Sequence, residues 1–238
     1  MNPIHPPRRV ALAALLLSGA LAVTLAAARA AEHPDAPPPT AASSDEAASV
    51  VVANLIYGGT RSSVCFSDKF LSTLAAETSI QTARKFKPVK LADADLFRYP
   101  FAVMTGEGAF TLTDAERENL KRYLERGGFL LASAGCSSTP WGESFTTEIQ
   151  RIFPDRALAD IPTDHEIFRT VHEVPQLKTK AADATLRGLM IDDKIVLVYS
   201  SDGLNDTSTM HGCCCCGGNE ILNAQQVNAN ILAYALLQ

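Results

Sequence analysis

The sequence is short of basic residues, and after its first 30 residues it has no apolar run long enough to span a bilayer. It contains 21 lysines and arginines against 26 aspartates and glutamates, which gives a formal charge of −5. An acidic surface repels phosphate backbones, so we expect no nucleic-acid partner. A transmembrane helix needs about 20 consecutive apolar residues. We therefore expect no stable membrane span beyond residue 30.

The first 30 residues have the three parts of a secretory signal. Arg8 and Arg9 precede an apolar stretch over residues 10–28, and Ala28 and Ala30 put small residues where a signal peptidase cleaves. We expect residues 1–30 to be a signal peptide that is removed, with a retained membrane anchor as the alternative. Cleavage would remove three arginines and no acid, taking the formal charge to −8.

These features predict a periplasmic or otherwise extracytoplasmic protein. The general secretory (Sec) route is the simpler expectation, and the Arg8–Arg9 pair leaves twin-arginine export as a second route. Residues 31–49 are rich in proline, alanine, serine and acid, which predicts a disordered linker. Residues 50–238 are expected to form one domain.

Short apolar runs alternate with helical patterns along that domain. The clearest helix begins at Thr113, where Glu116 completes a capping box, and it stops at Gly127. Alternating strands and helices predict an α/β fold with an open, mainly parallel sheet that has helices on both faces. Strands are expected at residues 50–57, 89–91, 101–104, 129–132, 186–190 and 195–199, with the last two joined as a hairpin through Asp192 and Asp193. His172 is also expected in a strand, and further helices are expected at 69–77, 144–153 and 223–237.

The six cysteines follow strands in this arrangement. Cys65 comes after the first expected strand, Cys136 after the strand at 129–132, and the run Cys213–Cys216 after the strand at 195–199. Parallel strands present their carboxyl ends, and usually their ligand sites, at one edge of the sheet. The cysteines are therefore expected to converge there, with Glu107 and Asp202 in neighbouring loops.

The segment from Tyr99 to Tyr234 resembles the family named domain of unknown function 4159. The resemblance rests on an ordered set of motifs: Tyr99-Pro100-Phe101, Gly106, Gly127-Gly128-Phe129, the stretch from Ile161 to Phe168, the strand from Ile195 with Asp202 after it, and Asn230 with Tyr234. It implies a flavodoxin-like fold of the class I glutamine-amidotransferase kind, and bacterial export, but no settled reaction. The sequence departs from the family at Ala134-Gly135-Cys136, where members often carry acidic residues, and in its cysteine run.

Metal binding is the first interpretation of the cysteines. Thiolates select soft or borderline metals, so Cys65, Cys136, Cys213, Cys214, Cys215 and Cys216 are candidate ligands for copper or an iron–sulfur cluster, with zinc as an alternative. Adjacent side chains diverge, so the run favours a polynuclear centre over one ion. Such a centre would serve electron transfer or metal handling, with a redox or metal-donor protein as partner. Other candidate cleft residues are Glu107, Asp164, His165, Asp202, His211 and Glu220.

Two other interpretations stay open. An oxidising compartment permits structural disulfides, which would make the protein a non-catalytic binding module. Alternatively, the chain is a redox or hydrolytic enzyme, because Cys136 occupies the strand-end position of the amidotransferase nucleophile. Gly135-Cys136-Ser137 lacks the flanking glycines of a nucleophile elbow, which counts against hydrolysis.

Overall fold

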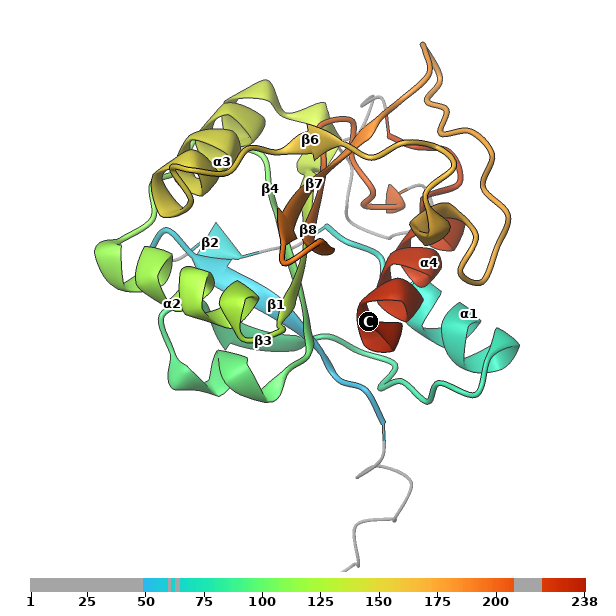
Figure 1. The fold of residues 1–238 in the computed structure, drawn as a ribbon, viewed down its shortest axis with the longest axis horizontal. Helices are drawn as coiled ribbons and strands as arrows, with labels where there is room; N and C mark the ends of the chain where they lie inside the picture. The colour runs from blue at the N-terminus through green and yellow to red at the C-terminus, as the bar shows by residue number, and fades with distance from the viewer. Residues whose placement is uncertain (1–48, 60, 63–64, 208–219) are drawn as a thin grey trace, which may run out of the picture. The chain divides into compact units, whose positions relative to one another are not determined.

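The computed structural model describes residues 49–59, 61–62, 65–207 and 220–238 (Figure 1). The expected signal peptide, nearly all of the expected linker, His211 and the run Cys213–Cys216 lie outside the described residues. In the described part of the chain, no helix is long and apolar enough to cross a membrane. The described residues form an α/β fold, as the alternation of strand and helix patterns predicted.

An eight-stranded mixed sheet forms the centre of the fold. Five strands are parallel, in the order β3-β1-β4-β5-β8, and β2, β6 and β7 pair antiparallel with their neighbours. The second, first, third, fourth and fifth parallel strands thus lie side by side, which is the flavodoxin-like order. The strands are β1 (Val52–Tyr57), β2 (Arg61–Ser62), β3 (Lys87–Lys90), β4 (Phe101–Gly106), β5 (Phe129–Ala134), β6 (Ala159–Asp160), β7 (Leu186–Ile191) and β8 (Lys194–Ser200).

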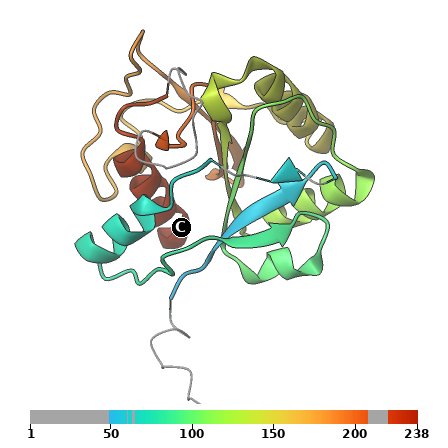
Figure 2. The same cartoon turned by 180° about the vertical axis from the view of Figure 1, so that it is seen from behind.

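Helices cover both faces of the sheet. The pair α1 (Lys69–Glu77) and α4 (Ala224–Leu237) lies on one face, and α2 (Asp114–Glu125) with α3 (Thr139–Ile152) on the other, as both views show (Figures 1 and 2). Three short 3-10 helices, η1 (Ala94–Arg98), η2 (Gly135–Ser137) and η3 (Glu166–Phe168), join these elements. Successive residues of a strand point to opposite faces. Accordingly, Phe101 and Val103 of β4 join the core under α1 and α4, whereas Ala102 and Met104 join the core under α2 and α3.

The predicted capping box at the start of α2 is confirmed and reaches further than the sequence indicated. Thr113 Oγ1 accepts a hydrogen bond from Glu116 N at 3.2 Å, and Glu116 Oε2 accepts one from Thr113 N at 2.7 Å. The second carboxylate oxygen of Glu116 accepts a bond from Gly58 N at 2.9 Å. One buried carboxylate therefore caps α2 and ties it to the loop that follows β1.

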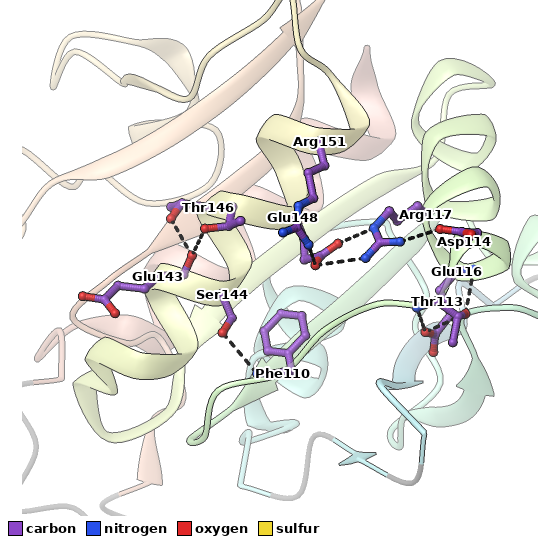
Figure 3. A network of polar contacts seen from close by, with 11 residues as sticks. Phe110, Thr113, Asp114, Glu116, Arg117, Glu143, Ser144, Thr146, Glu148 and Arg151 are labelled. Carbon is purple, nitrogen blue, oxygen red and sulfur yellow. Dashed lines mark hydrogen bonds and ion pairs between the residues drawn. The ribbon is translucent and has the colours of Figure 1, made fainter.

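An ion-pair network centred on the buried carboxylate of Glu148 joins α2 to α3 (Figure 3). Arg117 Nε and Nη2 donate to the two carboxylate oxygens of Glu148 at 2.6 and 3.2 Å, and Arg151 also donates to Glu148, at 2.9 Å. Glu148 is only 2% exposed, whereas Asp114, which pairs with Arg117 at 2.7 Å, is fully exposed. The hydrogen bond that Arg117 donates to Glu148 is the largest influence on this guanidinium, and it raises the pKa of Arg117.

Three local predictions need correction or extension. His172 was placed in a strand, but its segment has none, because its N–H and C=O groups bond to the side chain of Asn230 on α4 instead of to a neighbouring strand. The helix expected at 144–153 begins five residues earlier, where Ser138 caps it and Pro140 occupies its first turn. The predicted hairpin through Asp192 and Asp193 is confirmed, and both residues have positive φ.

Candidate functional site at the carboxyl edge of the sheet

Four parallel strands end at the edge where the candidate residues were expected. Glu107 follows β4, Cys136 follows β5, and Asp202 follows β8. Cys65 comes after β1 and β2, and its backbone oxygen accepts a hydrogen bond from Asn205, in the loop that leaves β8, at 2.6 Å. The structure therefore brings these four residues to one edge, although they are up to 137 positions apart in sequence.

The turn that carries Cys136 has an unusual backbone. Cys136 has φ 53° and ψ 33°, and Ser137 also has φ 53°. Two consecutive non-glycine residues with positive φ need support from their surroundings. That support includes Ser137 Oγ, which donates to the backbone oxygen of Asp202 at 2.7 Å, and Ser138 Oγ, which donates to the backbone oxygen of Glu107. The turn is thus fixed to the loops after β4 and β8.

A buried polar cluster around Asn205 joins these loops to the ends of the strands. Its Nδ2 donates to Thr105 Oγ1 at 3.0 Å as well as to the Cys65 oxygen, and its Oδ1 accepts from Ser133 Oγ at 2.5 Å. Thr105, Ser133 and Asn205 are all at most 2% exposed. Their hydrogen bonds join β4, β5, the loop after β8 and the Cys65 loop at one point. Buried networks of this kind fix one backbone arrangement when every member is satisfied.

Hydrogen bonds to backbone oxygens extend the same cluster to the segment before α1 and to α4. Ser67 N donates to the Asn205 backbone oxygen at 2.8 Å, and Asn228 Nδ2 of α4 donates to Leu204 O at 2.8 Å. Gly203 has φ 107°, and a Cβ there would lie 2.9 Å from Ala134 O. The loop after β8 therefore approaches β5 so closely that only glycine fits.

The two described residues that flank the cysteine run are bonded to each other. Glu220 Oε2 accepts from Thr207 N at 3.1 Å and from Thr207 Oγ1 at 2.8 Å. Beside them, burial is the main cause that raises the pKa of Asp206, and a hydrogen bond from Ser67 opposes it. The described chain on either side of Cys213–Cys216 is thus anchored at the same edge as Cys65 and Cys136.

The sulfur atoms of Cys65 and Cys136 both take part in disulfide bonds. Both residues are half-buried, and Cys136 Sγ lies 3.4 Å from Glu107 Oε1. A disulfide sulfur has neither the charge nor the nucleophilicity of a thiolate. Among the described residues, no group of three or more His, Cys, Asp or Glu side chains is arranged to hold a metal ion.

The chain belongs to the family described as domain of unknown function (DUF4159). The family model matches residues 51–236, which is the whole described domain apart from its ends. No curated protein matches the chain.

Two candidate residues of this DUF4159 domain lie away from the cysteine edge. Asp164 and His165 precede η3, and the His165 ring packs against Tyr234 of α4 at 5.5 Å between centroids. Glu166 shares a cavity of about 520 Å³ with Lys194, the first residue of β8, so this region belongs to the amino end of that strand. His165 caps η3, since its Nδ1 accepts a hydrogen bond from Ile167 N at 3.2 Å.

Sequence reasoning missed the polar cluster that organises the edge of the DUF4159 domain. Thr105 and Ser133 are single polar residues at the ends of otherwise apolar strands, and Asn205 follows Gly203 in a loop. A polar residue at the end of a buried strand was the available signal. Its partner could not be named, because the pairing depends on the order of strands in the sheet.

Proposed function

We propose that this DUF4159 protein is an exported thiol protein with two forms. In the oxidised form its cysteines are in disulfides, and in the reduced form they bind a soft metal centre, copper or iron–sulfur with zinc as the alternative, for electron transfer or metal handling. The observation that carries the proposal is that Cys65 and Cys136, at one edge of the sheet, both have a disulfide-bonded sulfur.

A disulfide supports this proposal through its geometry. Two sulfurs must approach to about 2.05 Å to form the bond. Two thiolates on one zinc ion each lie at about 2.3 Å from the metal. Two cysteines that can form a disulfide therefore have to move apart only slightly, after reduction, to bind one metal ion between them. The carboxylates of Glu107 and Asp202 are hard oxygen donors, so a soft metal would bind the cysteine sulfurs in preference to them.

The redox change itself is balanced by an external partner. Oxidation of two thiols to one disulfide releases two protons and two electrons, and thiol–disulfide exchange passes those electrons to a second disulfide through a mixed-disulfide intermediate. We infer a redox protein with its own dithiol–disulfide pair as that partner, and a metal-donor protein as the source of the metal. The half-buried positions of Cys65 and Cys136 leave part of each residue accessible to it.

The second candidate is a binding module with permanent structural disulfides, and the same two oxidised sulfurs favour it. A hydrolytic role has less support. Cys136 does occupy a sharp turn after a strand, with φ 53°, but a cysteine nucleophile has to be a free thiolate. Hydrolysis by Cys136 would require reduction first.

The proposal is tested by measuring free thiols and bound metal on the same preparation of protein. Protein purified without oxygen, with and without reductant, is assayed for free thiols after denaturation and for bound copper, iron, sulfide and zinc. We expect stoichiometric metal on the reduced protein and its release on acidification or oxidation, because metal and protons compete for thiolates. Failure to take up Cu(I), Zn(II) or a reconstituted iron–sulfur cluster would overturn the metal form. Six free thiols in protein prepared in air would overturn the disulfide form.

A serine variant sharpens this test. Replacing Cys214→Ser and Cys215→Ser together should lower the metal content severalfold, because a hydroxyl is a poor ligand for a soft metal. The control replaces Ser208→Ala and Thr209→Ala, which changes the same stretch of chain without removing sulfur. Equal loss of metal in both variants would show that the stretch, and not its thiolates, is responsible.

A further inference from the structure

A second, smaller cavity opens at the carboxyl edge of the sheet, between the start of α3 and the β7–β8 hairpin. Its volume is about 210 Å³, and its walls include Ser137, Thr139, Gly142, Arg187, Tyr199 and Ser201. Binding sites for whole small molecules usually measure about 300–1,000 Å³. This cavity is therefore of a size for one polar head group.

Arg187 supplies a positive charge to the cavity wall. It lies directly opposite Tyr199 in the β7–β8 register, and its guanidinium carbon stands 4.9 Å from the centre of the Tyr199 ring. Arg187 is half-buried, and none of the ion pairs formed among the described residues includes it. A guanidinium that is stacked on a ring and has no carboxylate partner within the described ranges is pre-oriented to bind a planar or tetrahedral oxyanion through two N–H groups.

Tyr199 supplies a second polar group. The residue is 2% exposed yet forms part of the cavity wall, and a Cβ at Gly142 would lie 2.5 Å from its hydroxyl oxygen. Glycine at position 142 thus lets the Tyr199 hydroxyl lie against the backbone at the start of α3, in the wall of the cavity. Burial is the largest influence on Tyr199 and raises the pKa of its phenol, with Arg187 opposing the rise. The phenol is therefore neutral at physiological pH and keeps a proton to donate.

We propose that this cavity binds a small oxyanion, a carboxylate or a phosphate group, with the Arg187 guanidinium as its charged partner and the Tyr199 hydroxyl as a second donor. The inference does not depend on the cysteines. Glu143, on the first turns of α3, also lines the cavity and bears the opposite charge. Its carboxylate weakens anion binding, so its removal should strengthen binding.

Two probes, inorganic phosphate and acetate, test the site at constant ionic strength. Binding is measured by calorimetry and by the fluorescence of Trp141, the one tryptophan of the chain, which adjoins Gly142 in sequence. We expect saturable binding with a Kd in the millimolar range and a preference between probes that identifies the group. Arg187→Met should weaken binding at least tenfold, and Glu143→Gln should strengthen it about twofold to fivefold, a change of roughly 1 kcal/mol or less.

The control is Arg169→Met, which removes the same charge from an exposed residue that lines the cavity beside Glu166 and Lys194. Arg187→Lys keeps the charge but not the fork of donors, and it should fall between wild type and Arg187→Met. Unfolding in urea shows whether each variant is folded. Equal weakening by Arg169→Met and Arg187→Met would reduce the effect to net charge and overturn the site, and so would the absence of saturable binding of both probes to wild type.

Discussion

Asn205 donates a hydrogen bond from its side-chain nitrogen to the backbone oxygen of Cys65, at 2.6 Å across 140 residues of sequence. The same side chain bonds Thr105 and Ser133, at the ends of the two central strands. The side-chain amide of Asn205 therefore fixes the backbone of Cys65 to the central strands of the sheet. Any change in the oxidation state of Cys65 takes place in a loop whose backbone is fixed at that point.

Asn205→Ala should be strongly destabilising for this reason. The change removes one hydrogen-bond partner from Ser133 Oγ, Thr105 Oγ1 and the Cys65 carbonyl. Thr105 Oγ1 still donates to Ser133 O, and Ser133 Oγ still accepts from Leu204 N, so the cost comes from three lost bonds at about 0.5–1.5 kcal/mol each. We expect a loss of about 3 kcal/mol in the free energy of unfolding, measured in urea. Asn223→Ala is the control, because the Asn223 side chain forms no capping bond at the start of α4. A loss below about 1 kcal/mol would contradict the importance of the cluster.

Local patterns were sufficient for most of the fold. The capping box at Thr113 and Glu116 and the glycines after α2 set that helix to within a residue, because those signals act between near neighbours. The common edge for Cys65, Cys136 and Asp202 followed from the rule for parallel strands, whereas the order of the strands did not follow from it. The start of α3 was missed because its first turn, with Thr139, Pro140 and Gly142, lacks apolar periodicity.

The candidate site was predictable only in part, for a physical reason. A strand end places Cys136, but which polar side chain meets which carbonyl depends on contacts between strands far apart in sequence. Asp164 and His165 show the same limit, because the sequence offers a titratable pair but not the edge of the sheet at which it lies. Their role as a cap and a ring contact against Tyr234 depends on how α4 packs.

Glu148 is expected to contribute far more to stability than Asp114, although both pair with Arg117. Glu148 is 2% exposed and satisfies two arginines, whereas Asp114 is fully exposed. Removing one partner of a buried pair costs about 3–5 kcal/mol, and an exposed pair contributes about 0–1 kcal/mol. Because Arg117 is itself partly exposed, Glu148→Ala should cost about 2–3 kcal/mol in urea unfolding. Similar losses in Glu148→Ala and Asp114→Ala would contradict the assignment.

Asp206→Asn should make the protein more stable at neutral pH. Burial raises the pKa of Asp206 in the folded state, so the folded protein holds that proton more tightly than the unfolded chain. The carboxylate is therefore unfavourable at neutral pH, and its penalty disappears as pH falls through the raised pKa. Asparagine removes the charge and tolerates the φ of 51° at this position.

The gain for Asp206→Asn should be small, a rise in Tm of about 1–2 °C, because solvent screens a partly exposed group. Scanning calorimetry at pH 7 and at pH 3 measures it. The difference between variant and wild type should shrink toward zero at the lower pH. A variant that is less stable at pH 7, or a gain that grows on acidification, would show that the carboxylate is used by a partner in the folded protein.

Reduction should destabilise the domain without dismantling its sheet. A disulfide typically contributes about 2–4 kcal/mol, largely by restricting the unfolded chain. We expect reductant to lower the free energy of unfolding of wild type by about that amount. Cys65→Ser should lose a similar amount before reductant is added and respond less to reductant afterwards. The cluster of Thr105, Ser133 and Asn205 bonds the backbone of Cys65 and not its sulfur, so circular dichroism of both reduced proteins should stay near that of wild type.

Peptide mapping without reduction then identifies the partner of each sulfur. Detection of Cys65 and Cys136 only as free thiols in such a map would remove the disulfide form from the account.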